Sequence, residues 1–191
     1  MQDTIILIGP MCAGKSTIAK LLAEELGTVR VELDELRWDY YPEAGYDDDE
    51  ARRIHAQSGN LGVLAYCKPF EVHAVERVLQ DHPGAVIDFG AGHTVQEDPE
   101  LLRRVQRALA PHRHVILLLP AADPVTSIQI LNQRFRTLLE REVGAVDERL
   151  LELNARFIRH PANQLLARVV LYTEGETPEE TCGRIRTLIE T

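Results

Sequence analysis

The sequence has few cysteines, few aromatic residues and no long apolar run. Its three cysteines, Cys12, Cys67 and Cys182, are scattered over 191 residues, and none lies in a Cys-x-x-Cys pair. A disulfide framework or a cysteine-based zinc site is therefore disfavoured, and a reducing, cytoplasmic compartment is expected. Because no stretch of about 18 apolar residues occurs, we expect no membrane span and no membrane partner.

The sequence also lacks an excess of positive charge. Its 30 acidic residues outnumber 21 lysines and arginines, which gives a formal net charge of −9. A general DNA or RNA surface needs clustered Lys and Arg, so no nucleic-acid partner is expected, although a nucleotide ligand needs only a few local donors. The first residues show neither a basic region nor a long apolar segment and do not resemble a signal peptide. The sequence is compatible with a monomer or a homodimer.

Short apolar segments rich in β-branched residues alternate with helical patterns along the chain. Strands are predicted at residues 4–8, 29–33, 85–89, 114–119 and 168–172. Helices are predicted at 16–26, 35–38, 50–80 with interruptions near 59 and 69, 99–110, 124–139, 147–159 and 178–189, with a loop at 40–49 and a flexible joint at 140–146. This alternation predicts one α/β domain over residues 1–191, with a mostly parallel five-stranded sheet and helices on both faces.

A phosphate-binding motif follows the first predicted strand. Residues 9–16 match Gly-x-x-x-x-Gly-Lys-[Ser/Thr] without a mismatch. Glycines let backbone N–H groups point at phosphate oxygens, and the following helix adds its positive end. In such loops the lysine, here Lys15, reaches the β- and γ-phosphates, and the hydroxyl of Ser16 binds Mg²⁺. We therefore predict ATP and Mg²⁺ as cofactors. The predicted nucleotide-binding residues here are Gly9, Pro10, Met11, Cys12, Ala13, Gly14, Lys15, Ser16 and Thr17.

Polar residues at the ends of the other strands are the candidates for chemistry. Ligands of parallel sheets bind beyond the carboxyl ends of the strands, so these residues should converge on one cleft. Asp34 could orient an acceptor hydroxyl and take its proton, or cap the short helix at 35–38, or do both. Asp88 could hold Mg²⁺ through water, or bind turn amides instead. His93 could contact the acceptor, or lie at the surface as a capping residue.

Arginines precede the predicted joint at 140–146. Arg134 and Arg136 could clamp the transferred phosphoryl group on a lid around residues 132–146 that excludes water when it closes. The alternative is a solvated helix face with ion pairs such as Arg136 with Glu140. An aromatic group, composed of Trp38, Tyr40, Tyr41 and Tyr46, could wall a substrate pocket or simply pack together.

Residues 5–23, which contain the phosphate-binding motif, resemble the start of a shikimate kinase, within the nucleoside-monophosphate-kinase group of P-loop kinases. The resemblance implies a three-layer fold with strand order 2-3-1-4-5 and a closing lid. It implies that Glu32 holds a Mg²⁺-bound water beside Asp34, and that the loop ending at Pro178 flanks adenine. The corresponding substrate-binding residues would be Asp34, Gly90, Ala91, Gly92 and His93.

Three features depart from that family. Glu32 stands where the family has the first aspartate of its pair, and the Gly-Gly-Gly turn is Gly-Ala-Gly followed by His93. The third departure concerns the acceptor. Where the family has an arginine for the substrate carboxylate, after a phenylalanine, Glu71 follows Phe70 here. A carboxylate cannot pair with the carboxylate of shikimate. Either Lys68, Arg52 or Arg53 replaces the arginine, or the substrate is different.

These features predict an ATP-dependent kinase that transfers the γ-phosphoryl group to a hydroxyl of a small molecule, such as a shikimate-like metabolite. The alternatives are a nucleoside or nucleotide kinase, an antibiotic phosphotransferase, and a P-loop ATPase that acts as a regulator without an acceptor. The acidic run at 47–50, together with Glu71, favours an amine-bearing antibiotic as a minor option. No Asn-Lys-x-Asp guanine motif and no Leu-Ser-Gly-Gly-Gln transporter motif occurs, which disfavours a GTPase switch and a transporter ATPase.

Overall fold

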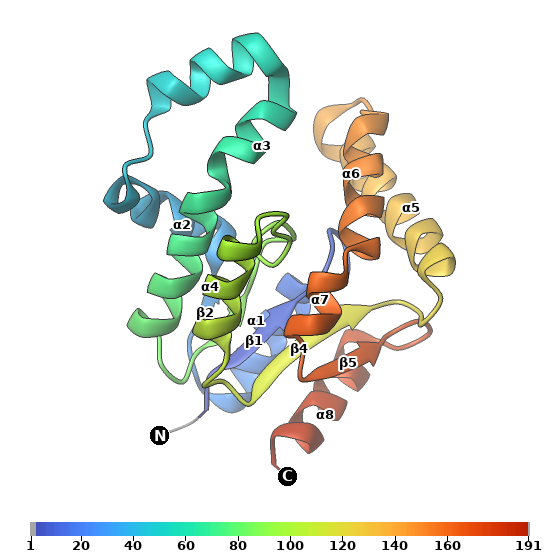
Figure 1. Ribbon diagram of the computed structural model, residues 1–191. Helices are drawn as coiled ribbons and strands as arrows, with labels where there is room; N and C mark the ends of the chain where they lie inside the picture. Colours follow the sequence, from blue (N-terminus) through green and yellow to red (C-terminus); the bar gives the residue numbers. More distant parts are fainter. Residues whose placement is uncertain (1–2, 191) are drawn as a thin grey trace.

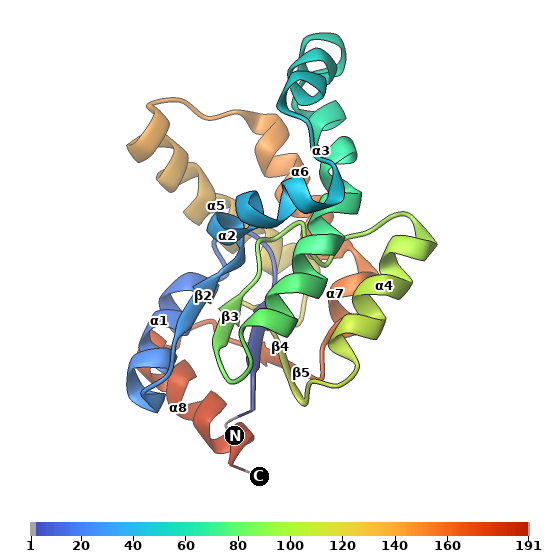
Figure 2. The ribbon, with the colours of Figure 1, turned by 90° about the vertical axis from the view of Figure 1, so that its left-hand side faces the viewer.

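A parallel sheet between two layers of helices forms the molecule (Figure 1, Figure 2). The structure, a computed structural model, describes residues 3–190. The strands are β1 (Ile5–Ile8), β2 (Arg30–Glu32), β3 (Val86–Asp88), β4 (His114–Leu119) and β5 (Val169–Tyr172). They pair in the order β2-β3-β1-β4-β5, and every pairing is parallel. The predicted three-layer fold with strand order 2-3-1-4-5 is confirmed.

The helices cover the sheet on both faces. They are α1 (Lys15–Leu26), α2 (Leu33–Tyr40), η1 (Tyr41–Ala44), α3 (Asp48–Asp81), α4 (Pro99–Leu109), α5 (Pro124–Val143), α6 (Glu148–Arg159), α7 (Pro161–Leu166) and α8 (Pro178–Ile189). Alternate residues of β1 point to opposite faces, so Ile6 and Ile8 pack with α3, α4 and α7. Ile5 and Leu7 pack with α1 and α8 on the other face. This two-sided burial explains why the strands read as continuous apolar runs.

Several helices begin directly after a side chain that caps their first turn. Asp98 and Asp123 accept hydrogen bonds from backbone N–H groups of the first turns of α4 and α5, and Thr177 forms a capping box with Glu180. The carboxylate of Asp47 caps α3 in the same way. Because each cap needs only residues next to it in sequence, these starts could be predicted locally.

Several predicted boundaries were wrong. Helix α2 begins at Leu33, directly after β2, so Asp34 lies inside the first helical turn and is not its cap. Helix α5 continues to Val143, through half of the predicted joint, and ends at Gly144, whose φ of 75° favours glycine. The predicted exposed loop at 40–49 contains the 3₁₀ helix η1 and the buried Tyr41. Helix α7 was not predicted, because its six residues are too few to show a helical period.

Two helical arms rise from the carboxyl end of the sheet (Figure 1). One arm is the first half of α3, which bends at Gly59, where φ is 63° and ψ is −161°. The other arm is formed by α5 and α6, which pack against each other. No helix within residues 3–190 has the length and apolar character required to cross a bilayer.

Candidate active site

The phosphate loop joins β1 to α1 at the carboxyl end of the central strand. Gly9 has a φ of 142°, and a Cβ there would lie 2.6 Å from the carbonyl oxygen of Leu118, so the loop passes β4 too closely for a side chain. Gly14, with a φ of 92°, precedes α1 and provides no side-chain cap. The first N–H groups of α1 are therefore left to an incoming anion.

Lys15 is the cation of this loop. Its side chain is buried, and its ammonium group donates hydrogen bonds of 2.9 Å to the carbonyl oxygens of Gly9 and Pro10. Burial lowers the pKa of Lys15, against the opposing pull of the Asp34 and Asp88 carboxylates. Within residues 3–190 this buried ammonium donates hydrogen bonds to carbonyl groups and not to a carboxylate. Such a cation is suited to a triphosphate, because the phosphate charge offsets the cost of removing it from water.

An asparagine of α6 holds the opposite side of the loop. The Oδ1 atom of Asn154 accepts a 2.9 Å hydrogen bond from the N–H group of Met11. The Nδ2 atom of Asn154 donates to the carbonyl of Met11 at 3.5 Å and to Oδ1 of Asn132, on α5, at 3.2 Å. Asn154 is fully buried. The N–H group of Met11, a predicted nucleotide-binding residue, thus points at α6, and its hydrogen bond to Asn154 fixes the position of the loop.

A cavity of about 240 Å³ lies beside the N-terminus of α1. It is lined by Ala13, Gly14, Thr17, Ile18, Arg134, Thr173, Glu176, Thr177, Pro178 and Thr181. The structure thus brings the predicted nucleotide residues Arg134 and Pro178 next to the phosphate loop. Burial raises the pKa of the Cys12 thiol in the phosphate loop, against the opposing charges of Lys15 and Arg134.

Glu32 and Asp88 end the neighbouring strands β2 and β3, and both carboxylates accept from Arg30 at the start of β2. Arg30 donates to Asp88 at 3.1 Å and to Glu32 at 2.5 Å. Asp88 is buried, and its second oxygen has no hydrogen-bond partner among residues 3–190. A Mg²⁺-bound water would supply that missing donor, so Asp88 fits the predicted metal-linked role.

Glu32 faces a different environment. It lines an open depression with Val29, Arg30, Val31, Glu35, Leu36, Asp39 and His82, none of which belongs to the phosphate loop. Burial and the charge of Asp88 raise the pKa of Glu32, against the opposing charge of Arg30. Of the two carboxylates, Asp88 is the better placed for magnesium. Within residues 3–190 no three His, Cys, Asp or Glu side chains gather into a metal cluster, and Ser16 is an exposed hydroxyl in the first turn of α1.

Asp34 lies against the turn that follows β3. A Cβ at Gly90 would lie 2.1 Å from an oxygen of Asp34, so only glycine allows this approach. Asp34 also accepts from Arg37 at 3.0 Å. The side chain of His93 is buried, so the interpretation as a surface residue is wrong. Its Nδ1 atom lies 4.0 Å from an oxygen of Asp34. Its Nδ1 atom lies 3.3 Å from the carbonyl of Gly90, which predicts that Nδ1 carries the proton.

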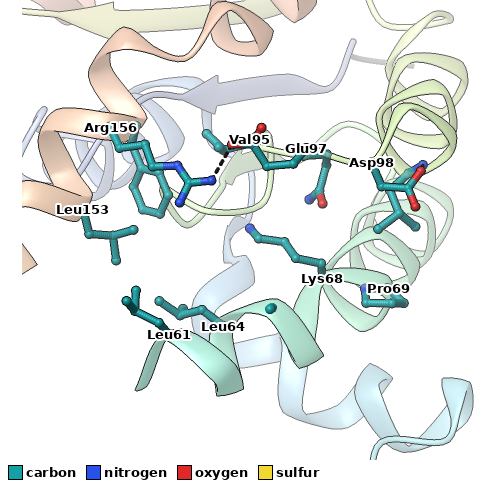
Figure 3. A pocket seen from close by; sticks show the side chains of 13 residues that line it. Leu61, Leu64, Lys68, Pro69, Val95, Glu97, Asp98, Leu153 and Arg156 are labelled. Carbon is teal, nitrogen blue, oxygen red and sulfur yellow. Dashed lines mark hydrogen bonds and ion pairs between the residues drawn. The ribbon is translucent and has the colours of Figure 1, made fainter. Parts of the chain in front are cut away.

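Figure 3 shows a second cavity, of about 440 Å³, on the other side of this turn. Its walls come from α3, from the segment 95–98, from the start of α4 and from α6. The lining residues are Leu61, Leu64, Ala65, Lys68, Pro69, Val95, Gln96, Glu97, Asp98, Leu101, Leu153, Arg156 and Phe157. Lys68 donates to the carbonyl of Gly92 at 2.9 Å, which places one end of the cavity at the predicted substrate turn. Behind that turn Ala91 packs with Val95 and Phe157.

Other candidates lie elsewhere. Arg136 forms an ion pair with Glu148 of α6 at 2.8 Å. This pair replaces the one with Glu140 that was given as an example of a solvated helix face. Arg136 lines neither of the two cavities. Arg52 and Arg53 are exposed and pair with Asp49 and Glu50, away from both cavities. Lys68 is the one of the three proposed replacement cations that reaches the substrate turn.

The aromatic group forms a packed cluster. Ring centroids lie 5.3 Å apart for Trp38 and Tyr41 and 5.4 Å apart for Tyr46 and Phe70. None of these rings lines the cavity beside Lys68. Packing, one of the two interpretations, therefore describes this group.

Sequence reasoning missed the contribution of α6. Asn154, Phe157 and Leu153 are separated from the phosphate loop by more than a hundred residues, so no local spacing connects them. One signal was present: Asn154 interrupts a helix face that otherwise carries Leu151, Ala155 and Ile158. A polar residue on an apolar face indicates a buried hydrogen-bond partner.

Known proteins resemble this chain over most of its length. The model of the AAA domain family matches residues 5–159. A shikimate kinase of Streptomyces coelicolor is 29% identical over 92% of this chain and 89% of its own. A shikimate kinase of Streptomyces avermitilis is 28% identical over 97% of this chain and 95% of its own. The solved structure of shikimate kinase from Acinetobacter baumannii in complex with shikimate has a TM-score of 0.67 at 21% identity, over 100% of this chain and 94% of the other, and shows the shared fold.

Proposed function

The chain belongs to the AAA domain family, and we propose that it is an ATP-dependent kinase that phosphorylates a hydroxyl of a small molecule. The observation that carries the proposal is the buried ammonium of Lys15 at the N-terminus of α1, whose hydrogen-bond partners within residues 3–190 are two carbonyl groups of the loop. The similarity to curated shikimate kinases over nearly the whole chain supports a small-molecule acceptor. The second cavity, next to the substrate turn, provides a place for it.

The phosphate loop would bind the triphosphate through its N–H groups and Lys15. Arg134 and Pro178 would enclose the nucleotide in the cavity beside α1. Ser16, and Asp88 through water, would hold Mg²⁺, which when bound neutralises charge on the phosphate oxygens. In this arrangement Met11 positions the loop through its N–H group, and Arg136 links α5 to α6.

Asp34 is the group we assign to the acceptor hydroxyl. It is half-exposed and lies against Gly90 of the substrate turn, so its carboxylate can accept the proton of a hydroxyl that reaches this turn from the second cavity. His93 adjoins Asp34 from the buried side. Gly90, Ala91 and Gly92 form the turn that Asp34 contacts at Gly90 and Lys68 contacts at Gly92. We further propose that residues 132–146, which carry Arg134, close over the nucleotide and exclude water during transfer.

The test is phosphoryl transfer from MgATP to a panel of small alcohols that includes shikimate, with products identified by ³¹P NMR. The Lys15→Ala variant should lose at least about 100-fold in kcat/KM, because it removes a cation from the transferring phosphate. Lys20→Ala, which changes an exposed lysine of the same helix, should retain full activity. ATP hydrolysis that no acceptor changes, or full activity of Lys15→Ala, would contradict the proposal.

A further inference from the structure

We propose that the acceptor of this kinase is a largely apolar, uncharged alcohol, with a body of one or two rings, instead of a carboxylate-bearing polyol. The inference rests on the proposed function and narrows its substrate. It comes from the cavity beside Lys68, whose walls are mainly hydrocarbon and whose charged groups already have partners (Figure 3).

The walls of the cavity come from two arms of the molecule. Helix α3 contributes Leu61 and Leu64, and α6 contributes Leu153 and Phe157. Figure 3 shows Leu61 and Leu64 on one side of the space and Leu153 on the other. The volume of about 440 Å³ is in the range of sites that bury ligands of one or more rings. Hydrocarbon walls of this kind favour an apolar ligand, because binding removes the apolar surface of both the ligand and the walls from water.

The cavity adjoins the groups proposed for chemistry. The carbonyl of Gly92 accepts from Lys68 at the inner end of the cavity. Gly90, two residues earlier in the same turn, contacts Asp34. Met11 of the phosphate loop packs against the cluster of Ala91, Val95 and Phe157 behind the cavity wall. A ligand that extends from this cavity along the turn, from Gly92 toward Gly90, would bring its hydroxyl to Asp34.

Lys68 is held by a buried carboxylate and is not free for a ligand. Its ammonium lies 2.7 Å from Glu71, whose side chain is 5% exposed. A ligand carboxylate that attracted Lys68 would leave Glu71 buried without a counter-charge, or would place two carboxylates beside one cation. Both arrangements are costly, because an uncompensated buried charge destabilises more than the new pair stabilises.

The other charged groups of the lining balance one another. Arg156 pairs with Glu97 at 2.6 Å at the mouth, where both side chains are more than half exposed. Such a pair is screened by water and contributes little to ligand selection. Asp98 uses its carboxylate to cap α4. Within residues 3–190 the lining offers one buried acceptor without a partner, the Oε1 atom of Gln96, which can serve a single hydroxyl group. The further hydroxyl groups of a polyol would meet mainly leucine and phenylalanine, which disfavours their burial.

Binding of two matched probes tests this inference. The neutral probe is 2-naphthalenemethanol, and the charged probe is 6-(hydroxymethyl)-2-naphthoic acid, which has the same rings and one added carboxylate. Their binding is followed by naphthalene fluorescence, and their phosphorylation from MgATP by mass spectrometry. The neutral probe should be bound and phosphorylated with a kcat/KM at least about 10-fold above that of the charged probe and of shikimate. A preference of the native protein for either carboxylate would overturn the inference.

Three variants locate the binding. Leu64→Asp places a charge in the cavity wall and should weaken the neutral probe by about 10-fold or more. Leu165→Asp, at an exposed leucine of α7 outside the lining, should leave its binding unchanged. Glu71→Gln frees Lys68 and should raise the affinity for the charged probe but not for the neutral one. Equal effects of Leu64→Asp and Leu165→Asp would contradict the assignment.

The two proposals fail in different ways. Binding of MgATP, measured by calorimetry without any acceptor, tests the nucleotide site alone, and its absence would remove the proposed function. If MgATP binds and another alcohol is phosphorylated while the neutral probe neither binds nor reacts, only the inference about the acceptor is wrong.

Discussion

At the scale of single residues, the side chains of the site differ in how far the sequence reveals them. Lys15 and Ser16 could be predicted because their roles follow from a motif eight residues long. The burial of His93 could not, because it depends on how the turn after β3 packs against Phe89 and Asp34. The ion pair of Lys68 could not be predicted either. The sequence shows that Glu71 replaces an arginine of the family, but only the structure shows that the Lys68 ammonium lies 2.7 Å from the Glu71 carboxylate.

His93 gives a prediction about stability and pH. Burial lowers the pKa of His93 below its usual 6.5, although Glu71, Asp34 and the Gly90 carbonyl pull it upward and Arg37 pushes it down. Between the folded and the unfolded pKa the unfolded chain binds more protons, so stability decreases as the pH falls below 6.5. The loss amounts to at most about 1.4 kcal/mol per pH unit from this residue. Urea denaturation at pH 5, 6, 7 and 8 measures it.

The variant His93→Asn isolates this contribution. Its amide can still donate to the carbonyl of Gly90 but does not titrate, so its free energy of unfolding should depend less on pH between 5 and 7. His55→Asn, on the exposed face of α3, should keep the pH dependence of the native protein. If His93→Asn and the native protein lose the same stability on acidification, His93 is not held neutral in the fold.

At the scale of elements, local signals set where helices begin, and packing sets where they end and what they contact. Asp98, Asp123 and Thr177 cap the helices that begin at the next residue, and these starts agree with the predicted ranges. The start of α2 was misplaced because the chain turns from strand to helix without a capping side chain. The role of α6 depends on its contact with the phosphate loop, which links Asn154 to Met11 across 143 positions.

Asn154 leads to a prediction about the coupling of α6 to nucleotide binding. Asn154→Ala removes the acceptor of the Met11 N–H group and leaves that part-buried donor unpaired, a cost of at most about 1–3 kcal/mol. We expect the KM for ATP to rise about 10-fold, with a smaller change in kcat, because the loop is held less well before ATP binds. Steady-state kinetics with varied ATP measure the split.

The matched control is Asn132→Ala. Asn132 accepts from Asn154 but does not touch the phosphate loop, so its loss should lower thermal stability and leave the KM for ATP near the native value. An unchanged KM in folded Asn154→Ala would mean that the asparagine stabilises α6 without positioning the loop.

At the scale of the whole molecule, the alternation of strands and helices predicts a parallel sheet, but not its strand order. The order 2-3-1-4-5 followed from the resemblance to shikimate kinases and is confirmed. The two cavities could not be predicted by either route. Leu61 and Leu153 face one space only because α3 bends at Gly59 and α6 returns toward the sheet. Arg134 and Pro178 meet the phosphate loop only once α5 and α8 are in place.

The nucleotide cavity predicts how the whole molecule responds to ATP. Its lining comes from α1, α5 and α8, while β1 contributes to the cores on both faces of the sheet. If the helices on one face of the sheet unfold, β1 loses its packing and the core on the other face is exposed. Residues 1–191 should therefore unfold as one domain in one transition. A non-hydrolysable MgATP analogue at 100 times its Kd adds about 2.7 kcal/mol to the folded state, which raises Tm by about 5–10 °C for a chain of this size.

Differential scanning calorimetry without any acceptor measures both effects together. Lys15→Ala should lose most of the increase in Tm, because the buried ammonium no longer meets the phosphates, whereas Lys20→Ala should keep it. Two transitions, of which the analogue moves only one, would show that the chain contains two independent units. The shift would then report on the unit with the phosphate loop alone, since a ligand stabilises only the cooperative unit that must open to release it.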